Sequence, residues 1–123
     1  MKQIRYYETL YLIRPDLEPE AYKSVVEKYN RIIEDNDGII EKVEEWGKRD
    51  LAYEVQKFKN GFYVLVRFYG GPELPDILHR NFRIDENVLK FIVIKLKDKV
   101  KPEELQQGEN LQNQEVRAEN GSK

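Results

Sequence analysis

The sequence contains no cysteine, and only one histidine and one tryptophan occur among its 123 residues. Without cysteine it can form neither a disulfide nor a thiolate metal site, which fits a reducing cytoplasm. No apolar run approaches the roughly 18 residues that a membrane-spanning helix needs. The apolar N-terminal stretch is interrupted by Arg5 and Glu8, unlike the core of a signal peptide. We therefore expect a cytoplasmic chain without membrane contact.

Groups that could carry out catalysis are equally scarce. His79 has no neighbouring nucleophile, so we interpret it as a surface residue. The pairs Glu44-Glu45 and Glu103-Glu104 are adjacent, and adjacent strand residues point to opposite faces rather than forming an acid–base couple. Gly70-Gly71 lacks the Lys-Ser/Thr of a phosphate loop and is followed by proline. The sequence predicts no enzyme, no metal, no cofactor and no small-molecule substrate.

Charge is abundant but unevenly distributed. Charged residues make up 36% of the chain, yet the net charge is only −2. Residues 16–45 hold ten acids against four bases, whereas residues 48–67 hold five bases against two acids, and residues 79–101 seven against three. Since salt screens charges beyond about 8–10 Å, a polyanion would respond to the local field. We expect the cations to gather on one side of the molecule.

The first third of the chain predicts a strand followed by a helix. Residues 4–13 are rich in aromatic and β-branched types and end at Arg14-Pro15, which is typical of a strand. Pro19 suits a first helical turn, and apolar residues from Tyr22 to Ile33 recur at the spacing of one helical face. Asp37-Gly38 ends this helix.

A second strand is predicted from Ile39 past Trp46, with a bulge or kink at Gly47. The alternation at residues 51–55 suggests that extended structure resumes there. Asn60-Gly61 is the strongest short hairpin signal and predicts the turn into a third strand at residues 62–70. A shorter helix follows at residues 74–82, and a fourth strand at residues 88–96.

This order predicts an α+β fold, the ferredoxin-like βαββαβ plait, with a four-stranded antiparallel sheet and two helices on one face. Because the third and fourth strands carry apolar residues on both faces, we expect the first, third and last strands in the sheet interior. This domain comprises residues 1–100. Residues 101–123 contain two Leu, one Val and no aromatic residue, too little apolar surface to offset the cost of ordering them. We expect a flexible, disordered polar tail there.

Two groups of cations are candidate RNA-binding residues. A kinked strand and hairpin would present four of them on one projecting element, and the second helix would carry two on one side. They are Lys48, Arg49, Lys57, Lys59, Arg80 and Arg83. An ordinary solvated surface is the alternative interpretation of both groups.

The sheet face without helices needs a cover, and a large exposed apolar surface usually marks an interaction site. The candidate partner-binding residues are Trp46, Leu51, Tyr53, Tyr63, Leu65 and Phe91, with Tyr63, Leu65 and Phe91 expected on one face opposite Phe62, Val64 and Ile92. A core position at the bulge is the alternative for Trp46. A rival hypothesis is an RRM-like single-stranded RNA-binding protein that stacks bases on Tyr63 and Phe91, although the usual RRM motif is missing.

Three stretches of the chain resemble one known family. YETLYLIRPDL at residues 7–17, WGKRDLAYEVQKFKNGFYVLVRF at 46–68 and FRIDENVLKFIVIKL at 82–96 are similar to the bacterial small-subunit ribosomal protein six family, and the resemblance covers about residues 4–97. It implies a structural protein that binds 16S rRNA in the platform of the small subunit, paired with small-subunit ribosomal protein eighteen. It also implies that Gly47, Lys48 and Arg49, with residues 51–53, face RNA and partner. Some relatives carry a Glu-rich tail, whereas this tail is rich in Gln and Asn.

Overall fold

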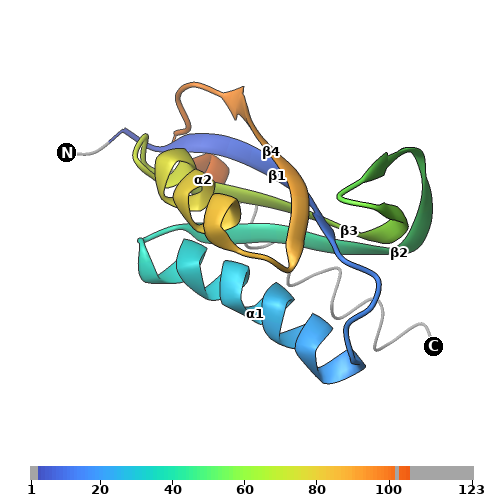
Figure 1. Ribbon diagram of the computed structural model, residues 1–123. Helices are drawn as coiled ribbons and strands as arrows, with labels where there is room; N and C mark the ends of the chain where they lie inside the picture. The colour runs from blue at the N-terminus through green and yellow to red at the C-terminus, as the bar shows by residue number, and fades with distance from the viewer. Residues whose placement is uncertain (1–2, 102, 106–123) are drawn as a thin grey trace, which may run out of the picture.

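Four strands and two helices follow one another in the order that the sequence predicts. The computed structural model describes residues 3–101 and 103–105. Its elements are β1 (Arg5–Ile13), α1 (Pro19–Asp35), β2 (Ile39–Val55), β3 (Phe58–Gly70), α2 (Leu74–Ile84) and β4 (Val88–Lys97). Both helices lie on the same side of a four-stranded antiparallel sheet (Figure 1). The βαββαβ plait is therefore confirmed.

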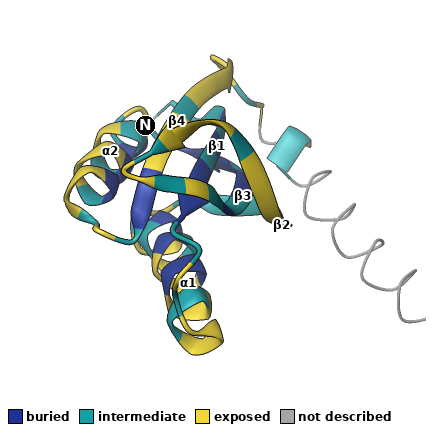
Figure 2. Ribbon diagram, turned by 45° about the vertical axis from the view of Figure 1, so that its right-hand side comes forward, coloured by how far each residue is buried: buried dark blue, intermediate teal, exposed yellow. Residues whose placement is uncertain are grey.

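The strands lie side by side in the order β2-β3-β1-β4, so β3 and β1 form the interior and β2 and β4 the edges. The expectation that the last strand is interior was wrong. Figure 2 shows the difference: buried residues dominate β1 and β3, whereas exposed residues run along β2 and β4. Lys90, Lys95 and Lys97 give β4 the charge that protects an edge strand from pairing with another chain.

The core lies between the sheet and the two helices, and three aromatic rings form its centre. The Tyr29 ring of α1 stacks on Phe82 of α2 with centroids 4.3 Å apart, and Tyr11 of β1 lies 5.0 Å from Phe82. The helices supply one apolar face each, as their spacing predicts. Their buried residues are Val25, Val26, Tyr29 and Ile33 of α1 and Leu74, Leu78 and Phe82 of α2.

Asp85, just after α2, ties the two helices together. Its carboxylate is 8% exposed and accepts hydrogen bonds from Tyr29 Oη (2.7 Å), Lys28 Nζ (3.1 Å) and the backbone N–H of Asn87 (2.9 Å). Burial alone would raise the pKa of this carboxyl group, but the three donors stabilise its charged form and hold the pKa of Asp85 below its ordinary value. The charged form is therefore part of the folded structure.

The turn between β2 and β3 lies at Gln56 and Lys57, whose φ angles are 48° and 72°, and Val55 pairs with Phe58. The predicted turn at Asn60-Gly61 was wrong, because both residues lie within β3 and pair with Asp50 and Arg49. Gly61 is required there for another reason. A Cβ atom at Gly61 would lie 2.7 Å from Leu12 Cδ1 and 2.9 Å from the carbonyl oxygen of Ile13, too close for any side chain.

The register of β2 against β3 shifts at three places before the turn, the first of them between Ile40 and Lys42. The predicted bulge at Gly47 is confirmed: its φ is 81°, and the register with β3 shifts between Glu45 and Gly47. The third shift lies between Asp50 and Val55, and the end of the hairpin bends back (Figure 1). There Gln56 Nε2 donates to the carbonyl oxygen of Leu89 at 3.2 Å, so the hairpin reaches across β1 to β4.

Only the first residues of the predicted tail can be compared with the structure. Residues 103–105 form one helical turn, in which the Glu104 N–H donates to the carbonyl oxygen of Lys101 at 2.9 Å. The Glu104 carboxylate lies 2.7 Å from Lys97 Nζ at the end of β4. The remainder of that prediction, residues 102 and 106–123, lies outside the described residues.

The close approach at Gly61 gives a first prediction. Changing Gly61 to Ala should lower the free energy of unfolding by about 1–3 kcal/mol, because the Ile13 backbone cannot move aside. Lys57→Gly is the control, since it removes a side chain from a left-handed position and should cause no loss. Thermal unfolding followed by circular dichroism checks both. A tolerated Gly61→Ala with a destabilising Lys57→Gly would contradict this description of the hairpin.

Asp85 gives a prediction on acid stability. Its folded pKa lies below the unfolded value of about 3.9, so the unfolded state binds more protons between these values and stability falls as pH falls through them. Asp85→Asn should be less stable at pH 7 and lose less stability than the parent between pH 5 and pH 2. Tyr29→Phe, which removes one of the three donors to Asp85, should likewise reduce the dependence of stability on pH. Urea unfolding across this pH range measures it, and parallel curves for parent and Asp85→Asn would refute the assignment.

Candidate RNA and protein interface

The sheet face turned away from the helices, here called the open face, carries an apolar strip along its β4 side. Thr9 and Tyr11 pair with residues that face the helices, so Leu10 and its partner Ile92 face the opposite way. The strip is formed by Leu10, Ile92 and Ile94, and is followed at the register shift near the end of β4 by Leu96. The last three are 51%, 41% and 44% exposed, high values for large aliphatic side chains. Sequence reasoning did not select them for partner binding, because it assigned Phe91 and not Ile92 to the open face.

An aromatic pair lies beside this strip. The Trp46 ring of β2, 39% exposed, lies 5.9 Å from the Tyr63 ring of β3, with 52° between the ring planes. The Trp46 indole N–H donates to the Glu44 carboxylate at 3.1 Å, and Arg49 Nε donates to the Trp46 carbonyl oxygen at 3.2 Å. Trp46, Arg49 and Tyr63 line a shallow hollow of about 350 Å³. The bulge at Gly47 thus places the Trp46 ring next to the Arg49 guanidinium group.

A second hollow lies on the other side of Tyr63. It measures about 190 Å³ and is lined by Leu10, Tyr63, Lys90, Phe91 and Ile92. The Lys90 ammonium lies 5.9 Å from the centroid of the Tyr63 ring, within the range of a cation–π contact. Tyr63 therefore separates two hollows, and each has a cation at its side.

The six predicted RNA-binding cations do not share a single face. Lys48 pairs with Phe62, which pairs with Ile13, so the bulge lies where β1 ends and β4 begins. Lys48 Nζ lies 5.9 Å from the Phe62 ring on the helix side, whereas Arg49 lies on the open face. The other four are exposed: Lys57 and Lys59 on the hairpin, and Arg80 and Arg83 on α2. The expectation of one positive side was wrong, because neighbouring strand residues alternate and α2 belongs to the other layer.

The predicted partner-binding residues divide as well. Trp46 and Tyr63 lie on the open face, and Leu65 is buried there at 7% exposure. Leu51 is half-buried in the bent part of the hairpin, next to Tyr53 at 84% exposure.

Phe91 lies on the helix-covered face, so its expected place beside Tyr63 was wrong. Its ring stacks on Phe82 at 4.9 Å and meets the edge of His79, which is exposed as expected. Ile92 occupies the position on the open face instead. A shift of one residue exchanges the two faces of a strand, and the sequence alone does not set the register of β4.

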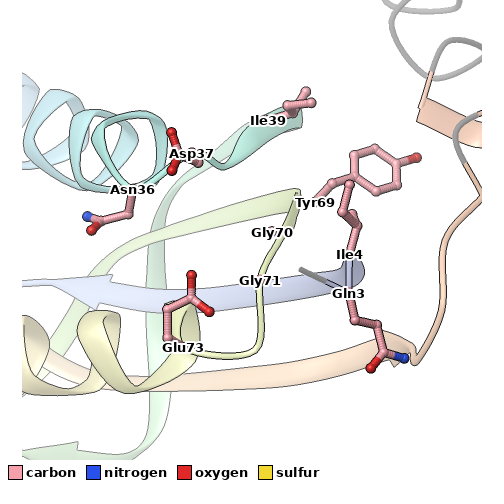
Figure 3. A pocket seen from close by; sticks show the side chains of 9 residues that line it. All are labelled: Gln3, Ile4, Asn36, Asp37, Ile39, Tyr69, Gly70, Gly71 and Glu73. Carbon is pink, nitrogen blue, oxygen red and sulfur yellow. The ribbon is translucent and has the colours of Figure 1, made fainter. Parts of the chain in front are cut away.

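A third hollow, of about 180 Å³, lies at the opposite end of the molecule (Figure 3). The ends of β1, α1, β3 and α2 surround it, and its lining includes Tyr69, Asp37 and Glu73. It contains none of the residues that the sequence singled out for binding. Across residues 3–101 and 103–105, no group of His, Cys, Asp and Glu side chains could hold a metal ion. In the same residues, no helix has the length and apolar character to cross a membrane.

In the described part of the chain, a plait with an uncovered apolar face and cations around exposed rings is typical of the class of proteins that work through binding surfaces. Comparison with known proteins agrees with this class. Residues 6–95 match the sequence profile of the family described as ribosomal protein S6. The chain belongs to the ribosomal protein S6 family, whose members are structural, non-enzymatic components of the ribosome.

Individual relatives support the assignment. The small ribosomal subunit protein bS6 of Clostridium novyi is 45% identical over 91 residues, which cover 74% of this chain and 96% of the relative. The bS6 protein of Moorella thermoacetica is 42% identical over 95 residues, covering 77% and 97%. The crystal structure of 30S ribosomal protein S6 from Thermotoga maritima superposes with a TM-score of 0.73 at 28% identity, covering 88% of this chain and 96% of that one.

Proposed function

We propose that this chain binds 16S rRNA together with small-subunit ribosomal protein eighteen during assembly of the platform of the small ribosomal subunit, in the cytoplasm. Membership of the ribosomal protein S6 family supports the ribosomal role. The observation that carries the finer proposal is the open face, where an apolar strip lies next to cations at one end of the sheet. Such a surface suits two ligands of different chemistry.

The apolar strip is the proposed contact for protein eighteen. Ile92, Ile94 and Leu96 lie on an edge strand and expose contiguous aliphatic surface, which costs free energy in water until a partner covers it. Leu51 and Tyr53 on the bent hairpin would extend this contact across the sheet. Leu65 is already buried, so it would shape the surface on which the partner lies rather than add exposed area to the contact.

The cations at the hairpin end are the proposed contacts for rRNA. Lys48, Lys57 and Lys59 are exposed on the hairpin, and Arg80 and Arg83 are exposed on α2 in the other layer. Folded RNA presents phosphates and 2′-hydroxyls in a fixed geometry that such cations can match without reading the sequence. Arg49 on the open face would connect this region to the partner surface.

The RRM-like alternative is not favoured. It needs Tyr63 and Phe91 on the same face for stacking, whereas Phe91 stacks on Phe82 within the helix-covered core.

Cooperative RNA binding is the first expected outcome. Residues 101–123 hold three of the 21 bases and five of the 23 acids, which leaves 18 of each in residues 1–100. A neutral domain should bind the platform rRNA weakly, and a partner held on the apolar strip should raise the affinity by linking two contacts. Filter binding with the chain alone, protein eighteen alone and the pair measures this. Equal affinity of the single chain and the pair would contradict the proposal.

Removing two cations should weaken the ternary complex without unfolding the chain. Lys48→Ala with Arg49→Ala should lower the affinity for rRNA and reduce the salt slope by about 1 for each phosphate that is no longer neutralised. The matched control is Lys23→Ala with Arg31→Ala, two exposed cations of α1. Affinity is measured at several salt concentrations and melting temperature by circular dichroism. A large drop in melting temperature, or an equal loss of affinity in the control, would show that Lys48 and Arg49 do not bind RNA.

A further inference from the structure

We infer that the aromatic pair of Trp46 and Tyr63 binds one unstacked base of single-stranded RNA, with the adjoining phosphates held by Arg49 and Lys90. The inference rests on the proposed function, which requires RNA at this end of the sheet, and it assigns to RNA two residues that the sequence analysis gave to the protein partner. Exposure and aromatic character alone do not distinguish RNA from protein as the ligand of these two rings. The distribution of ion pairs on the open face distinguishes the two ligands.

Most cations of the open face are neutralised by carboxylates of the same chain. Lys42 lies 2.9 Å from Glu44, Arg67 lies 2.9 Å from Glu8, and Lys97 lies 2.7 Å from Glu104. These pairs reduce the attraction that this part of the sheet can exert on a polyanion.

Arg49 and Lys90 differ from them. Among the described residues neither has a carboxylate within ion-pair distance: Arg49 Nε donates to the Trp46 carbonyl oxygen, and Lys90 lies over the Tyr63 ring. The remaining guanidinium and ammonium donors are available to an anion. These two cations, unpaired among the described residues, thus border the same aromatic pair, one on each side of Tyr63.

The hollow between Trp46, Arg49 and Tyr63 offers ring faces rather than aliphatic walls. Bases stack on such faces irrespective of their identity, and a backbone that follows unpaired cations is typical of proteins that bind single-stranded nucleic acid. The strip of Ile92, Ile94 and Leu96 offers an apolar segment of a protein more aliphatic surface to bury. The chemistry around Tyr63 therefore favours a nucleotide, and the strip favours the protein.

The chain contains a single tryptophan, so its fluorescence reports on this position alone. The full chain is titrated at low salt with single-stranded oligoadenylate, with a duplex RNA of equal phosphate number and with purified tryptophan-free protein eighteen. Stacking should quench Trp46 with the single strand, and the duplex should quench it much less. Tyr63→Leu should weaken oligoadenylate binding by roughly 5- to 150-fold, since one base–aromatic stack is removed.

Matched variants separate stacking from charge. Tyr63→Phe keeps the ring and should bind oligoadenylate like the parent, whereas Arg49→Gln should weaken binding more than Lys97→Gln, which removes an equal charge that Glu104 already neutralises. Equal quenching by duplex RNA, or equal weakening in both charge variants, would overturn the inference in favour of general attraction to phosphate. Quenching by protein eighteen alone, without a response to oligoadenylate, would assign the rings to the protein partner.

The inference and the proposed function can fail separately. If oligoadenylate leaves Trp46 unchanged while the chain still forms a complex with platform rRNA and protein eighteen, the stacking inference is wrong and the proposed function stands. If the ternary complex also fails to form, the proposed function is wrong.

Discussion

Two helices cover one face of a four-stranded sheet, and the rest of the molecule follows from this one-sided burial. The packed rings of Tyr11, Tyr29 and Phe82 fix the helices on the sheet, and Asp85 at the end of α2 ties α1 to α2. Within the described part of the chain nothing comparable covers the other face, although β1, β3 and β4 alternate apolar residues toward it. A sheet of this kind exposes aliphatic side chains to water unless another molecule covers them. We propose that this uncovered face is the functional one.

The β2–β3 hairpin covers part of that face and shapes the remainder. A glycine with positive φ at position 47 bends β2, which places Trp46 beside Tyr63 and leaves Arg49 next to both. The hairpin end then reaches β4 through Gln56. The open face is divided as a result: an aromatic and cationic region lies at the hairpin end, and an aliphatic strip follows β4. One small domain can in this way offer adjacent surfaces to RNA and to protein.

The sequence predicted those features that depend on local spacing. The apolar period of α1, the order of the six elements and the bulge at Gly47 each leave a signal within a few residues. The wrong predictions concern features that are set by packing or pairing with a strand distant in the sequence. Asn60-Gly61 has the composition of a turn, but Gly61 is needed because β1 passes too close for a Cβ atom. Ile92 and Phe91 could not be assigned to their faces either, since the register of β4 depends on its pairing with β1. The cations were expected on one side of the molecule because the sequence does not reveal which of the two layers of the fold each of them belongs to.

Covalent labelling of the open face in free protein and in purified small subunits tests the central claim most directly. Hydroxyl-radical labelling followed by mass spectrometry can compare Ile92, Ile94, Leu96 and Trp46 in the two states, with Lys23 on the exposed side of α1 labelled by an amine reagent as an internal reference. If the open face is where the ribosome holds this chain, labelling of the four residues should fall strongly in the subunit while Lys23 stays reactive. Equal labelling of the open face in both states would contradict the account.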